Sequence, residues 1–162
     1  MKILFIGDVV GKSGRRALRR FLPELQDETE ADLTVVNAEN AAGGFGVTAG
    51  VLEEFLEQSE IDVLTSGNHI WDKREALDLI QDEPRLLRPH NYPEDTPGSG
   101  WIVATASNGV RVGVLNIMGT VFMHPTLDCP FSSANLAIEK KPSDVQAVLV
   151  DFHAEATSEK VA

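Results

Sequence analysis

The chain has 162 residues, 43% of them hydrophobic, so it is long enough to bury one core and short for two domains. Its 14 basic and 25 acidic side chains give a formal charge of -11, which argues against tight non-specific binding to nucleic acid. The lone cysteine, Cys129, excludes an intramolecular disulfide and a thiolate zinc cluster. We expect a single cytoplasmic domain over residues 1–162 without a membrane segment.

Apolar runs alternate with helical patterns in the first half of the chain. The run Ile3–Ile6 stops at Gly7 and predicts a strand buried on both faces. After it the pattern predicts a helix around 18–25, a strand at 33–36, a helix around 51–56 with Thr48 as its N-cap, a strand at 61–65 and a helix at 73–81. This order is typical of a parallel sheet covered by helices.

The second half has a different pattern. Proline and glycine crowd residues 84–100, and two strands, 101–106 and 110–117, flank Ser107-Asn108-Gly109, where Asn-Gly favours a hairpin turn. A short helix is predicted at 131–138, and a buried strand at 147–152 leads to His153. The fold class predicted from these elements is therefore α/β with a mixed sheet.

Side chains of the kinds that bind metals follow four predicted strands, and these are Asp8, Glu39, Asn68 and His153. The carboxyl ends of parallel strands share one rim of a sheet, so these distant segments can converge. Carboxylate, amide and imidazole ligands suit Mn, Fe or Zn more than Mg alone. Two ions about 3.5 to 4 Å apart could generate a hydroxide and clamp the oxygens of a phosphoryl group.

His69 follows Asn68 directly, and there it would donate a proton to the leaving oxygen or stabilise its charge. Taken singly, each residue has an ordinary explanation: Asp8 as a cap, Glu39 as a solvated acid, Asn68 as a turn residue, His153 as a hydrogen-bonded core histidine. The joint pattern at the strand ends favours the metal site over these explanations.

The segment Gly7-Asp8-Val9-Val10-Gly11-Lys12-Ser13 is close to a phosphate-binding P-loop. A P-loop needs four residues between its first glycine and Gly-Lys-Ser, and this segment has three. Asp8 would also repel a triphosphate. A P-loop nucleotide hydrolase is therefore a distant alternative.

The chain resembles the YmdB-like branch of the calcineurin-like metallophosphoesterase superfamily, in the blocks "ILFIGDVVGKSGR", "NAENAAGGFGVT", "GNHIWDK", "RPHNYPEDTPGSGW", "NIMGTVFM" and "DFHAEATSEK". The resemblance implies a layered α/β/β/α fold and a dinuclear metal centre. It also implies a phosphodiesterase, in which a metal-bound hydroxide attacks small phosphodiesters such as 2′,3′-cyclic or 3′,5′-cyclic AMP.

The resemblance also implies roles for single residues. Asp8 and Glu39 would hold one metal, Glu39 would bridge, and Asn68 and His153 would help hold the second. Asn40 matches a position near the metals and the substrate. His69 matches the histidine that serves as catalytic proton donor or stabilises the leaving group.

This sequence departs from the family at one motif. Members carry a Gly-Thr-His-Thr-His segment whose histidines complete the metal shells, whereas the four histidines here, His69, His90, His124 and His153, form no such motif. We therefore expect a domain incomplete at its carboxyl terminus, with a homo-oligomer as one way to complete it. The alternative to an enzyme is a catalytically impaired scaffold or binding module.

Overall fold

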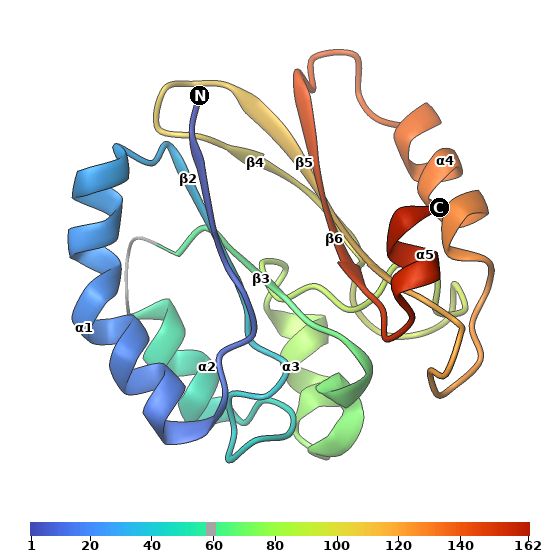
Figure 1. Cartoon of the computed structure of the whole chain (residues 1–162), viewed down its shortest axis with the longest axis horizontal. Coiled ribbons are helices and arrows are strands. Elements are labelled where there is room, and N and C mark those ends of the chain that lie inside the picture. The colour runs from blue at the N-terminus through green and yellow to red at the C-terminus, as the bar shows by residue number, and fades with distance from the viewer. Residues whose placement is uncertain (58–60) are drawn as a thin grey trace.

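The computed structural model describes residues 1–57 and 61–162. The alternating pattern of the first half builds a parallel sheet in the order β1 (Ile3–Ile6), β2 (Leu33–Asn37), β3 (Val63–Thr65). The connections run through α1 (Gly11–Thr29) and α2 (Ala49–Leu56), which lie together on one face of this sheet (Figure 1). All three strands therefore end at the same rim.

A second sheet, formed by residues from the second half, is mixed as predicted. β4 (Trp101–Thr105) is antiparallel to β5 (Arg111–Met118), and β6 (Ala147–His153) runs parallel to β5. In the turn between β4 and β5, Gly109 has φ +83° and its N–H donates to the carbonyl of Ala106 at 2.8 Å. This is the left-handed conformation that glycine adopts without steric cost, and the predicted hairpin is confirmed.

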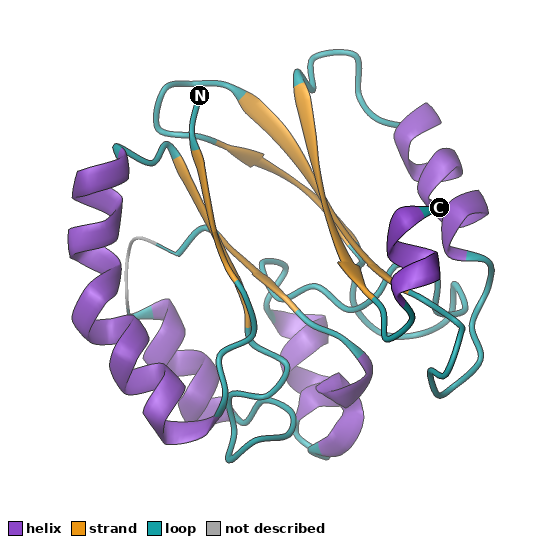
Figure 2. Ribbon diagram, in the orientation of Figure 1, coloured by secondary structure: helices purple, strands orange, loops and turns teal. Residues whose placement is uncertain are grey.

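The two sheets face each other between outer helices, which confirms the expected α/β/β/α layering (Figure 2). On the outer side of the second sheet lie α4 (Pro130–Glu139) and α5 (Thr157–Val161). The ring of Phe131 on α4 meets that of Phe152 on β6 edge to face at 6.1 Å. The short helix α5 is an element that the sequence pattern did not predict.

Two apolar clusters hold the layers together. The cluster between the sheets is made of buried aliphatic residues from both, namely Leu33, Val35, Val63, Leu87, Ala106, Val112 and Val114. On the other face of the parallel sheet, Phe55 of α2 and Leu22 of α1 are almost fully buried. Their burial fixes the helices, and with them the loops that join helices to strand ends.

The prediction that β1 and β6 are fully buried is wrong. Phe5 of β1 is 40% exposed and Val150 of β6 is 41% exposed. Within the described residues β1 pairs only with β2 and β6 only with β5, so each is an edge strand. An apolar run reports the hydrophobicity of a strand, but whether neighbouring elements cover both of its faces depends on the tertiary fold.

The helix predicted at residues 73–81 begins later. A 3-10 helix, η1 (Asn68–Asp72), comes first, Lys73 has extended backbone angles, and α3 spans Ala76–Asp82. Thr48 does precede α2 in the extended conformation of an N-cap, although its side chain makes no capping hydrogen bond. In residues 1–57 and 61–162, no helix is long and apolar enough to cross a membrane.

Candidate metal centre

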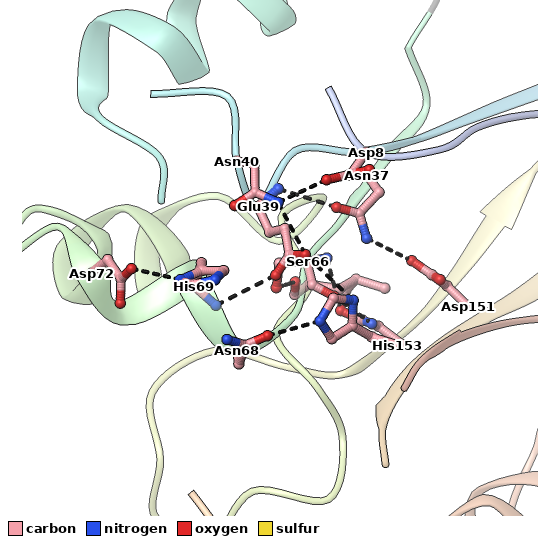
Figure 3. Close-up of polar contacts among 12 residues, drawn as sticks. Asp8, Asn37, Glu39, Asn40, Ser66, Asn68, His69, Asp72, Asp151 and His153 are labelled. Atoms are coloured by element: carbon pink, nitrogen blue, oxygen red, sulfur yellow. Dashed lines mark hydrogen bonds and ion pairs between the residues drawn. The ribbon is translucent and has the colours of Figure 1, made fainter. Parts of the chain in front are cut away.

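The predicted site residues gather where strands of both sheets end (Figure 3). Asp8 and Glu39 lie in the loops after β1 and β2, and Asn68 opens η1 after β3. His153 is the last residue of β6 in the opposite sheet. The shared rim therefore extends across the sandwich, and it brings a histidine from one sheet to carboxylates from the other.

Glu39 is the buried centre of this group, with 2% of its surface exposed. Its Oε1 lies 3.4 Å from Nδ1 of His153, and its Oε2 accepts a bond from the backbone N–H of His69 at 3.4 Å. Burial raises the pKa of Glu39, and the nearby His153 opposes that rise. A desolvated carboxylate of this kind gains stability when a positive charge binds beside it.

Asn68 and His153 form the second part of the group. Nε2 of His153 and Oδ1 of Asn68 are 2.8 Å apart. Gly67 leaves the space that separates these groups from Glu39, because a β-carbon there would collide with Oε2 of Glu39 and lie 2.6 Å from Nε2 of His153. Only glycine keeps this gap between the carboxylate and the imidazole open.

Asp8 joins the site through Asn40. The Asn40 amide donates to Oδ2 of Asp8 at 2.7 Å and lies 3.3 Å from Oε1 of Glu39. An open cavity of about 370 Å³ is lined by Glu39, Asn40, Asn68, His69 and His153, among others, and Asp8 lies outside this lining. The structure thus brings the predicted residues together, and Asp8 is joined to the others by its hydrogen bond from Asn40.

His69 is held by a partner that the sequence analysis missed. Its Nδ1 lies 2.7 Å from Oδ2 of Asp72, at the other end of η1. A carboxylate on Nδ1 orients the imidazole and leaves Nε2 available for a substrate. The spacing of three residues within "NHIWD" was the available signal, because it places both side chains on one side of a helical turn.

Two further sets of hydrogen bonds hold residues next to the site. The Asn116 amide of β5 donates to the carbonyl of Ser66 at 2.9 Å, and its Oδ1 accepts from the Ser66 N–H at 2.9 Å. Asn37 donates to Asp151 at 3.1 Å and accepts from the N–H of Glu39 at 3.2 Å. The Asn37–Asp151 bond joins β2 to β6, and the Asn116–Ser66 bonds join β5 to the residue before Gly67.

The donor set fits a divalent cation. Carboxylate, amide and imidazole groups face one cavity, and the gap at Gly67 lies between two of them. In the described residues, no three side chains of the Asp, Glu, His and Cys types converge closely enough to form a ready-made metal-binding group. Any ion held here would therefore depend on the amide oxygen of Asn68 as well as on the charged ligands.

Comparisons with known proteins identify relatives. Residues 4–162 match the family described as YmdB-like protein. The chain is 45% identical over 162 residues to the 2′,3′-cyclic-nucleotide 2′-phosphodiesterase of Bacillus subtilis (strain 168), with 100% of this chain and 60% of that protein covered. It is 34% identical over 168 residues to a putative phosphatase/phosphodiesterase of Mycoplasma genitalium, with 99% and 57% covered.

Solved structures have the same fold. A hypothetical protein from Thermus thermophilus superposes with a TM-score of 0.89 at 38% identity, covering 99% of this chain and 61% of that one. A phosphatase from Mycoplasma pneumoniae gives 0.88 at 34% identity, covering 99% and 58%. All 162 residues of this chain match the Bacillus subtilis relative, and they span about 60% of that protein's length.

Proposed function

This chain belongs to the YmdB-like protein family, and on that premise we propose that it acts as a phosphodiesterase whose site is the cavity around Glu39. The observation that carries the proposal is the approach of Glu39, Asn68 and His153 from two different sheets, beside the His69–Asp72 pair. A P-loop hydrolase gains no support from this family.

We assign the metal ligands as follows. Asp8 and Glu39 would hold one divalent cation, Glu39 would bridge, and Asn68 and His153 would hold the second. When bound, such cations supply positive charge opposite the phosphoryl oxygens and lower the pKa of a water molecule. Fe, Mn and Zn suit this mixed donor set best.

The protein's own groups position the substrate and handle the proton. Asn40 lines the cavity and its amide nitrogen donates to both carboxylates, so it fixes their orientation. His69 would hold a proton at Nε2 and transfer it to the leaving oxygen. Asp72 contacts Nδ1 of His69 and thereby fixes the orientation in which Nε2 meets the substrate.

The substrate class proposed is the cyclic nucleotides. The Bacillus subtilis relative is named for 2′,3′-cyclic nucleotides, and 45% identity over 162 residues supports a related substrate here. The 3′,5′-cyclic nucleotides are a second substrate to test. A cytoplasmic location and a homo-oligomer stay predictions.

The test is hydrolysis of 2′,3′-cyclic AMP by the purified chain with Mn²⁺, with bound metal measured on the same samples. His69→Ala should lower kcat by about 10²- to 10⁴-fold, the usual range for a general acid, and leave the metal content unchanged. His90→Ala is the matched control, because this histidine does not line the site cavity. Binding of metal without hydrolysis by the unaltered chain would favour the binding-module alternative instead.

A further inference from the structure

The loop after β5 forms one wall of the candidate site. Residues Phe122, Met123 and His124 line the same cavity as Glu39 and His153. They follow β5 of the second sheet, whereas Asn68 and His69 of the same lining belong to η1. None of the metal or proton-transfer roles proposed above uses this wall.

Buried Glu159 of α5 holds this loop in place. Its carboxylate accepts bonds from the backbone N–H of Thr120 at 2.8 Å, from the N–H of Val121 at 3.1 Å and from the Thr120 hydroxyl at 3.0 Å. Gly119 allows the close approach, since a β-carbon at that position would collide with Oε2 of Glu159. Three charge-assisted bonds to one anchor make the loop a fixed feature of the fold.

Phe122 follows this anchor and points its ring to solvent. It is 83% exposed, the highest fraction among the large exposed hydrophobic side chains of the described residues. Its φ of +63° lies in the left-handed region, which residues with a β-carbon adopt at a cost. The ring of Phe122 therefore lines the site cavity and is open to contact with a ligand.

We infer that Phe122 is the surface on which the base of a nucleotide stacks while its phosphate lies beside Glu39, Asn68 and His153. The inference rests on the proposed function and deepens it. An aromatic face binds any base through stacking and needs no hydrogen-bond pattern, so Phe122 selects nucleotides over sugar phosphates without choosing among bases. A phosphodiester that has no planar group would make no stacking contact with Phe122.

Binding of two monoesters that differ only in the base separates this contact from the rest of the site. Adenosine 5′-monophosphate and ribose 5-phosphate are titrated calorimetrically into the Mn²⁺-loaded chain. The unaltered chain should bind the nucleotide about tenfold more tightly, which lies within the range of effects of one stacked base. Phe122→Ala should reduce this preference to about twofold or less, and Phe122→Tyr should retain it.

Phe21 provides the matched control, since it is an exposed phenylalanine on α1 that does not line this cavity. Phe21→Ala should keep the preference of the unaltered chain. The inference is overturned if the unaltered chain shows no preference, or if Phe122→Ala keeps it in full. Because neither ligand is hydrolysed as a diester, a failure to turn over cyclic AMP counts against the proposed activity alone.

Discussion

The carboxylate of Glu39 lies 3.4 Å from Nδ1 of His153, although the first follows β2 of the parallel sheet and the second ends β6 of the mixed sheet. The contact places a desolvated anion beside an imidazole whose other nitrogen meets Asn68. The two sheets therefore share one polar site, and its parts can be tested one at a time.

Glu39→Gln should separate folding from cation binding. With chelator present, the variant should unfold within about 1 kcal/mol of the unaltered chain, since the amide avoids the cost of a buried charge. Mn²⁺ at 100 times its dissociation constant should stabilise the unaltered chain by about 2.7 kcal/mol for each ion bound, and the variant by almost nothing. Thermal unfolding with and without Mn²⁺ measures both quantities. Equal stabilisation of the two proteins would remove Glu39 from the ligand set.

Asp8→Asn tests the ligand that lies behind Asn40. We expect the metal-to-chain ratio after gel filtration to fall, because an amide replaces an anionic ligand. Elemental analysis of both proteins gives the ratio directly. Asp95→Asn serves as control, since Asp95 is exposed and far along the chain from every proposed ligand. A ratio unchanged by Asp8→Asn would mean that Asp8 only orients Asn40.

Asp72→Asn should slow hydrolysis through His69. The amide cannot orient the His69 ring as the carboxylate does, so kcat should fall about 10- to 100-fold. Steady-state kinetics with 2′,3′-cyclic AMP measure this fall, and KM should stay unchanged because Asp72 does not line the cavity. A kcat equal to that of the unaltered chain would mean that Asp72 does not act through His69.

Asn116→Ala should destabilise the fold and the site together. The change leaves the N–H and the carbonyl of Ser66 unpaired in a buried place, at a combined cost of about 2 to 5 kcal/mol. Urea unfolding measures this loss. Because Ser66 precedes Gly67 and Asn68, affinity for Mn²⁺ should fall as well. A loss below about 1 kcal/mol would mean that water replaces the side chain.

Glu159 should give the loop at residues 119–125 a pH dependence. Burial alone raises the pKa of Glu159, but its bonds from Thr120 and Val121 outweigh burial and hold the pKa below its ordinary value of 4.5. A depressed acid stabilises the folded state above its unfolded pKa, so this contribution is complete above 4.5 and is lost as the pH falls below it. Glu159→Gln should unfold more easily at neutral pH, with the difference narrowing below pH 4.5. Thermal unfolding across this range measures it.

The order of elements along the chain and the meeting of the ends of β1, β2 and β3 could be predicted from sequence, because apolar runs define the strands and parallel strands of one sheet share a rim. His153 ends a strand of the other sheet, so its approach to Glu39 depends on how the two sheets pack. The exposed edges of β1 and β6 could not be predicted, since exposure depends on neighbours distant in sequence. Asn116 lies inside an apolar strand and Glu159 in a charged segment, and neither pattern reveals a partner far along the chain.

The proposed ligands come from two different sheets. The affinity for an ion therefore depends on the distance between these sheets. A bound cation would cross-link the layers and resist their separation during unfolding. Leu87 and Val112 lie in the apolar cluster between the sheets and outside the lining of the cavity. Larger or smaller side chains there would change the spacing between Glu39 and His153, so repacking this interior could tune which ion fits without altering any ligand.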